Sequence, residues 1–180
     1  HGGTGVPYLQ PLPEENTCYA AGCHGSVSSG ASTKNIQSTA DKFYAHPTNT
    51  ESGKHLHPDT PASRNVPDRH AECQDCHSPH AARKGLHSEG SNAVSNVLLG
   101  VPGVIPGPTP MWSQPTVFTN VSAALQENQI CFTCHSYNGF GTTFNGSSGI
   151  IGPSGVPITD QAMEFNPANR SAHPVQVPAN

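Results

Sequence analysis

Three cysteine pairs, each followed at once by a histidine, are the residues of this chain whose spacing could do chemistry. Two pairs have the spacing C-x-x-C-H, in CQDCH at 73–77 and in CFTCH at 131–135. The third, CYAAGCH at 18–24, has four residues between its cysteines instead of two. The pairs are Cys18 with Cys23, Cys73 with Cys76, and Cys131 with Cys134, and the histidines that follow them are His24, His77 and His135.

This spacing is the attachment signature of a c-type haem. Two thiols three positions apart can reach the two vinyl groups on one edge of a porphyrin and form thioethers, and the next residue is placed to ligate the iron. Six cysteines could also form three disulfides, two haem sites with one disulfide, or half-sites for zinc. Neither disulfides nor zinc require a histidine after each pair, so the sequence predicts three haem c groups. The wide spacing makes the first site the least regular.

The composition leaves too little apolar material for an ordinary core. Hydrophobic residues make up 33% of the 180 residues, below the roughly 45–50% of globular chains. Glycine and proline contribute 18 residues each, which would favour disorder without a cofactor. Porphyrins would supply the missing interior. We therefore predict a single triheme domain over 1–180, mostly irregular coil with a few short α-helices and little or no β-structure, compactly wrapped around three covalently bound haems.

The charge and the chain's apolar runs limit its partners and location. The net charge is −4 with histidine neutral, and no basic stripe favours nucleic acid. No apolar run approaches the ~20 residues that span a bilayer, so we expect no membrane span. Covalent haem attachment takes place outside the cytoplasmic membrane, and the chain begins at His1 rather than Met. We expect an exported protein, extracellular or at the cell surface, with the periplasm as the alternative.

The sequence predicts extended segments and two helices as the elements that must position these residues. Glycine and proline in residues 1–17 predict an extended arm, and residues 136–180 form a second Gly/Pro-rich segment. Prolines between 102 and 110 force an extended path. Two helices are expected, a short one within Lys34–Tyr44 and a longer one over Val121–Cys134 that delivers the third cysteine pair and is capped by Asn120 or Ser122.

Eight further histidines could supply a second axial ligand to each iron. His46 and His173 rank first, because each lies in an A-H-P tripeptide after a haem site, a faint repeat in which the chain attaches a haem, loops out and returns a histidine. His80 lies too close to His77 to reach the other face of the same porphyrin, so it would serve a different haem. The remaining candidates are His55, then His57, and His70 could serve a neighbouring haem. We expect His1 and His87 to be bystanders, with Met111 and Met163 as weaker alternative ligands.

Two imidazoles per iron would have a direct chemical consequence. They give a six-coordinate iron with a lower potential than Met/His ligation. No position then stays open for a substrate. The sequence therefore predicts electron transfer and no enzymatic activity.

Several stretches resemble the multihaem c-type cytochromes of metal-reducing and sulfur-metabolising microbes. They are GKH at 53–55, RHAECQDCHSPHA at 69–81, ENQICFTCH at 127–135 and SAHPV at 171–175. The likeness is greatest to the extracellular cytochromes that polymerise into nanowires, in which C-x-x-C-H-x-P-H recurs. The resemblance implies that His80 ligates a haem other than its neighbour, sometimes in another subunit, and that His55 and His173 are distal ligands. It covers about residues 50–140 and the A-H-P sites, and three haems are fewer than the better-known members carry.

Three functions are compatible with these features. The first is the repeating subunit of an extracellular filament, a homopolymer with inter-subunit haem contacts that passes electrons to redox partners or external acceptors. The second is a discrete periplasmic or secreted triheme electron shuttle, which the length per haem and the acidity disfavour. The third is a multihaem reductase, for which 8 lysines and arginines offer little oxyanion binding.

Overall fold

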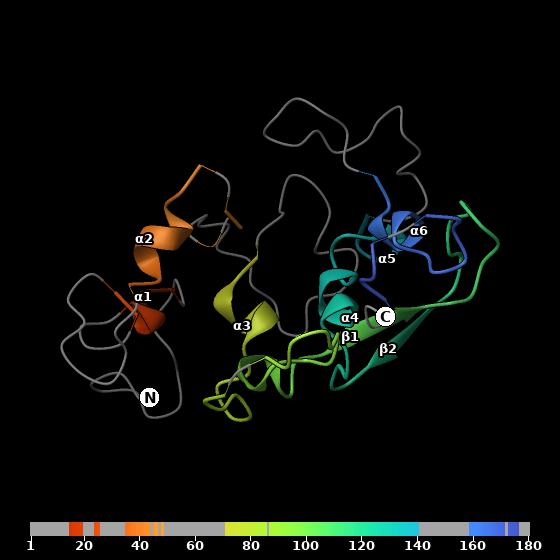
Figure 1. The fold of residues 1–180 in the computed structure, drawn as a ribbon. Helices are drawn as coiled ribbons and strands as arrows, with labels where there is room; N and C mark the ends of the chain where they lie inside the picture. Colours follow the sequence, from red (N-terminus) through yellow and green to blue (C-terminus); the bar gives the residue numbers. More distant parts are fainter. Residues whose placement is uncertain are drawn as a thin grey trace. The chain divides into compact units, whose positions relative to one another are not determined.

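The structure, a computed structural model, consists mostly of irregular coil. It describes residues 15–19, 24–25, 35–43, 45–46, 48, 71–85, 87–140, 159–171 and 173–176. Within these ranges the chain forms six short α-helices, one 3₁₀ turn and a two-stranded sheet (Figure 1). The expected irregular fold with few helices is confirmed. The elements are α1 (Glu15–Cys18), α2 (Gln37–Ala40), α3 (Cys73–Cys76), η1 (Asn96–Leu98), β1 (Gly103–Pro106), β2 (Phe118–Val121), α4 (Glu127–Cys131), α5 (Tyr137–Phe140) and α6 (Gln161–Glu164).

The chain divides into two compact units. Unit 1 comprises residues 1–57 and 68–73, and unit 2 comprises residues 58–67 and 74–180. The division falls within α3, so that Cys73 belongs to unit 1 and Cys76 to unit 2. The expected arm over 1–17 lies outside the described residues up to position 14, and its last three residues form the start of α1.

An antiparallel hairpin and two small apolar clusters form the core of unit 2. Strands β1 and β2 pair from Gly103 opposite Val121 to Pro106 opposite Phe118. The first cluster consists of Val101, Ala124 and Ile130, and Cys76, Val94 and Leu98 pack against it. The second consists of Val104, Phe132 and Ala162, and Phe118, Phe165 and Val175 pack against it. We refer to them as the first and the second cluster. Helix α4 contacts β1 (Figure 1).

The long helix predicted over Val121–Cys134 is wrong in its first half. Val121 ends β2, and α4 begins only at Glu127. The residues between them bond to a distant part of the chain instead, since the Ala124 amide donates to the Val101 carbonyl at 2.7 Å. The side-chain oxygen of Gln129 accepts from the amide of Leu125 at 2.9 Å and so starts the helix, in place of the expected caps Asn120 and Ser122. Tertiary pairing therefore overrides local helix propensity here.

The hairpin is the second departure from the sequence prediction. Its prolines do give an extended path, as expected, but part of that path is β1, paired over four residues with β2. Val104 is buried at 2% exposure while Ile105 is 41% exposed, so the strand presents one face to the core. None of the helices in the described ranges has the length and apolarity needed to cross a membrane.

Candidate haem sites

The second cysteine pair and its histidine sit on the short helix α3. Cys73 and Cys76 are its first and last residues, and both side chains are half-buried. The exposed His77 follows, and its Nδ1 lies 2.9 Å from the backbone carbonyl oxygen of Val97, in η1. A carbonyl oxygen only accepts hydrogen bonds, so Nδ1 carries the proton and donates it. The lone pair of the ring is therefore on Nε2, which is the arrangement of a histidine that ligates a metal through that atom.

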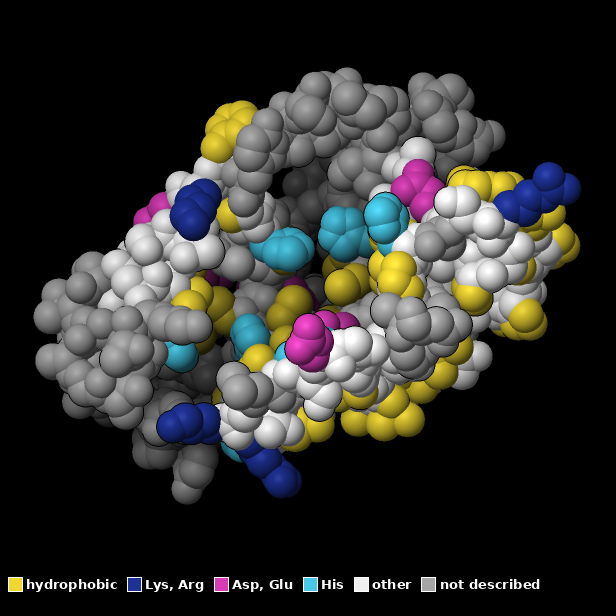
Figure 2. Space-filling view, in the orientation of Figure 1, with side chains coloured by type: hydrophobic (Ala, Val, Ile, Leu, Met, Phe, Trp, Pro, Cys, Tyr) yellow, Lys and Arg dark blue, Asp and Glu magenta, His cyan; other side chains and the backbone are white. Residues whose placement is uncertain are grey.

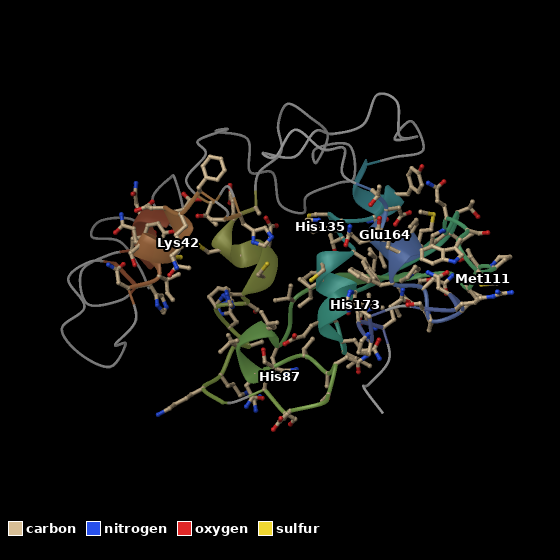
Figure 3. All side chains as sticks on the ribbon, turned by 45° about the horizontal axis from the view of Figure 1, so that its top comes forward. Lys42, His87, Met111, His135, Glu164 and His173 are labelled. Atoms are coloured by element: carbon tan, nitrogen blue, oxygen red, sulfur yellow. The ribbon has the colours of Figure 1, made fainter. Side chains whose placement is uncertain are left out.

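The third pair lies at the end of α4 and is anchored by the core. Cys131 is the last helical residue, and the amide of His135 donates to its carbonyl at 2.8 Å, so the motif makes one further turn. Between the cysteines, Phe132 is 1% exposed and belongs to the second cluster. The buried hydroxyl of Ser136 donates to the Phe132 carbonyl at 2.5 Å. The turn that carries both thiols is thus fixed from within, and His135 lies beyond α4 (Figure 3).

Cys76 of the second site lies beside the third site in unit 2. Cys76 packs against the first cluster, whose Ile130 directly precedes Cys131. Burial raises the pKa of the Cys76 thiol to about 11, and Asp75 and the sulfurs of Cys131 and Cys134 add to the rise. Desolvation also raises the pKa of Cys131, with Glu127 contributing. Both are therefore protonated thiols at neutral pH, which keeps the unattached pairs weakly nucleophilic.

The first site belongs to unit 1. Cys18 ends α1, and its carbonyl accepts the amide of His24 at 3.0 Å. The backbone of His24 therefore returns to that of Cys18, at the start of the wide motif. Cys23 lies outside the described residues, whereas His24 is exposed.

The candidate second ligands are at the surface where the structure describes them. His46, His80 and His173 are exposed. His55 lies outside the described residues, as do His1, His57 and His70. Figure 2 shows histidine side chains in cyan on the surface. His87 lies 3.8 Å from a carboxylate oxygen of Glu127. Of the two methionines, Met111 is 42% exposed and Met163 is half-buried in α6.

The donor set of these sites fits a covalently attached haem. Cys76 and Cys131 are thiols without a disulfide, so neither C-x-x-C pair is closed into one. Within the described ranges, histidine, cysteine and acidic side chains form no group of three or more that could hold a metal ion. A c-type haem needs only two thiols and one imidazole from each motif, and α3 with His77 offers that set.

Two features that shape the sites escaped the sequence analysis. The first is the main-chain carbonyl of Val97, which orients His77. Every residue has such a carbonyl, so the residue type does not predict this contact. The second is the buried aromatic ring of Phe132 between two cysteines, which anchors the third site. An aromatic residue inside an otherwise polar motif was the signal that could have identified it.

Comparison of this chain with protein-family models, curated proteins and solved structures found no match.

Proposed function

We propose that this chain is a triheme c-type cytochrome that transfers electrons. The observation that carries the proposal is the second site, where two half-buried cysteines on one helical turn precede a histidine whose Nδ1 donates to Val97. That pattern offers two thioether positions and a free Nε2 together. Haem iron, when bound, supplies reversible one-electron exchange between its ferrous and ferric states.

The side chains of this chain have defined roles in the proposal. The cysteine pairs fasten the three groups, and His24, His77 and His135 each hold one axial position. The candidates for the opposite positions are His46, His55, His80 and His173. With imidazoles on both sides, the side chains leave no place for a substrate, so the protein conducts electrons and is not an enzyme.

The spacing of the sites in unit 2 supports conduction. Cys76 and Ile130, the residue before Cys131, meet on one cluster. The chain thus fastens two of its groups at neighbouring points, which is what a relay of electrons requires.

The proposed setting is a filament outside the cell. The C-x-x-C-H-x-P-H sequence at 73–80 resembles that of polymerising cytochromes, and His80 is exposed, so that a neighbouring copy can use it. Large apolar side chains also lie on the surface, with Trp112 at 55% and Val117 at 65% exposure. We propose that copies of this chain form the repeating subunits of an extracellular filament that carries electrons to external acceptors.

Intact mass tests the haem proposal. The chain is produced with an export signal in a host that attaches haem c, and its mass is measured after denaturation. We expect the 18.8 kDa polypeptide plus three haems, with modified cysteines in all three motif peptides. The matched variant Cys73→Ala with Cys76→Ala should lose one haem and keep two. A purified protein with the mass of the bare polypeptide would disprove the proposal.

Cryo-electron microscopy of the same material tests the filament. Ordered filaments with continuous haem density across subunits are expected. Monodisperse particles at all concentrations, with three haems and reversible redox behaviour, would instead identify a discrete electron shuttle.

A further inference from the structure

The first and third sites close their motifs with the same backbone hydrogen bond. In both, the amide of the motif histidine donates to the carbonyl of the first cysteine, from His24 to Cys18 at 3.0 Å and from His135 to Cys131 at 2.8 Å. The separations are six and four residues, so the two extra residues of the wide motif lie within its loop. The ends of the two motifs therefore meet in the same way despite the different spacing.

A four-residue helix then docks on the same atom in each site. The first residue of α2, Gln37, donates its amide to the His24 carbonyl at 3.2 Å. The first residue of α6, Gln161, donates to the His135 carbonyl at 3.0 Å. In chain order these helices follow their motifs at very different distances, so the match is not a consequence of local sequence.

The two A-H-P segments also turn in the same way. After His46, the amide of Thr48 donates to the His46 carbonyl at 2.7 Å. After His173, the amide of Val175 donates to the His173 carbonyl at 2.7 Å. Both turns span a proline, and both histidine side chains are exposed.

An aromatic residue in each motif connects the A-H-P segment to its own site. Tyr19 follows Cys18, and its hydroxyl lies 3.3 Å from the Thr48 hydroxyl. Phe132 follows Cys131, and Val175 packs on the second cluster, to which Phe132 belongs. In unit 1 the residue two positions after the histidine lies within hydrogen-bond distance of the residue after the first cysteine. In unit 2 the corresponding residue packs on the cluster that contains the residue after the first cysteine. Packing of the His173 ring edge-on to Phe165, at 6.2 Å between centroids, adds to the contact at the third site.

The second site lacks the aromatic residue in its motif and an A-H-P segment of its own. Gln74, a polar residue, follows its first cysteine, and no A-H-P tripeptide lies between this motif and the third one. Its nearby His80 lies in S-P-H, with the proline before the histidine.

We propose that the first and third sites are two copies of one binding unit, and that each unit carries its own second ligand. His46 serves the iron of the first site, and His173 serves the iron of the third. Tyr19 and Phe132 are positioning residues, because they hold the returning segment against the motif. The second site has no such segment and takes its second ligand from elsewhere. This assignment rests on the proposed haem function and adds which histidine belongs to which iron.

The assignment is tested by measuring the spin state of the haem irons in proteins that lack either the first or the third site. One background carries Cys18→Ala with Cys23→Ala, and the other carries Cys131→Ala with Cys134→Ala. Intact mass verifies two haems in each. His46→Ala and His173→Ala are then introduced into the three-haem protein and into both backgrounds, and electron paramagnetic resonance measures the high-spin ferric fraction.

In the three-haem protein, each variant should convert one iron in three to high spin, and added imidazole should restore low spin. The His46→Ala signal should disappear when the first site is absent and persist when the third is absent. His173→Ala should show the reverse. His87→Ala, which removes an exposed histidine paired with Glu127, is the matched control and should leave every iron low-spin.

Two results would overturn the assignment. One is a high-spin signal from His46→Ala in protein without the first site, and the other is full low-spin character in three-haem His46→Ala. Either leaves the haem function standing, because three haems are still present by mass. Where the alanine variants do not accumulate, His46→Met keeps a ligand and should raise the potential of one iron, only when the first site is present. A raised potential without that site also contradicts the assignment.

Discussion

The first and third sites share their backbone hydrogen bonds, but they differ in the buried side chains that support them. The third rests on the two apolar clusters of unit 2, with Phe132 1% exposed. Among the described residues of unit 1, the buried side chain is that of Glu15, and Phe43 is 76% exposed. The same hydrogen bonds between the ends of a motif therefore occur once on an apolar core and once, in the described residues, without one.

This difference shows that local hydrogen bonds can specify a site without supplying its stability. Backbone bonds contribute only about 1 kcal/mol each, whereas ordering a residue costs about 1–2 kcal/mol. The first site must therefore gain its stability from another source. Under the proposed function that source is the attached porphyrin, so the two sites should respond differently to its loss.

Loss of a haem should have the largest effect, and it should be far larger at the first site. Protein with Cys18→Ala and Cys23→Ala should lose amide protection over residues 15–48, with local stability near zero. Protein with Cys131→Ala and Cys134→Ala should keep slow exchange in β1 and β2, since the hairpin packs on protein side chains. Hydrogen exchange with mass spectrometry measures both. Equal loss of protection in the two variants would remove the distinction between the sites.

Truncation of a motif aromatic tests the core beneath the third site. Phe132→Ala should lower the free energy of unfolding of unit 2 by about 3–5 kcal/mol, because it empties the centre of the second cluster. Phe43→Ala, in exposed surroundings, should change stability by less than about 0.5 kcal/mol. Denaturant titration of the holoprotein, followed by circular dichroism, gives both values. A cost for Phe132→Ala below about 1 kcal/mol would show that the site does not depend on the cluster.

Glycines that touch the motif backbone test the geometry that the two sites share. A Cβ on Gly139 would lie 2.7 Å from the Thr133 carbonyl oxygen, and one on Gly25 would lie even closer to the Tyr19 carbonyl. Overpacking costs about 1–3 kcal/mol, which exceeds the gain of up to about 1 kcal/mol from alanine in a helix. Each alanine variant should therefore reduce haem occupancy at its own site alone, measured by peptide mass. Gly107→Ala, 3.1 Å from the Val117 carbonyl oxygen and away from every motif, is the control and should keep full occupancy.

The sequence was sufficient to locate the reactive residues, because cysteine spacing and the following histidine are local properties. It also indicated the irregular fold, since proline and glycine act on their own backbone. The sequence did not indicate that Gly103 pairs with Val121. This pairing joins residues 18 positions apart in the chain. Because Val121 belongs to β2, the helix predicted from that residue begins only at Glu127.

The parallel between sites was visible only in part. Two A-H-P tripeptides can be read from the sequence, but the bonds of α2 and α6 to motif carbonyls join segments that local patterns do not connect. The bond between His77 and the carbonyl of Val97 likewise joins segments that local patterns do not connect. Main-chain acceptors are identical in every residue, so only the folded path shows which one is used.

Helix caps should give a smaller difference between the sites. Asp160 accepts the amides of Ala162 at 2.8 Å and of Met163 at the start of α6, and it is 2% exposed. Before α2, the half-buried Asn35 accepts the amide of Ser38 at 3.1 Å. Asp160→Ala should cost about 1 kcal/mol and Asn35→Ala only about 0.5 kcal/mol. Thermal unfolding of the holoprotein compares them, and a larger loss for Asn35→Ala would reverse the expected order.

The buried acid at the start of α6 should give the smallest effect, a shallow pH dependence. Burial raises the pKa of Asp160 above its ordinary 3.8, against the opposing amides of Ala162 and Met163 and with a further rise from Glu164. The folded protein therefore binds this proton more tightly than the unfolded chain. The free energy of unfolding should then fall as pH rises through the interval just above 3.8. Asp160→Asn keeps an acceptor oxygen but has no titrating proton, so its profile should be flatter there. An identical slope in both proteins would show that other groups set this dependence.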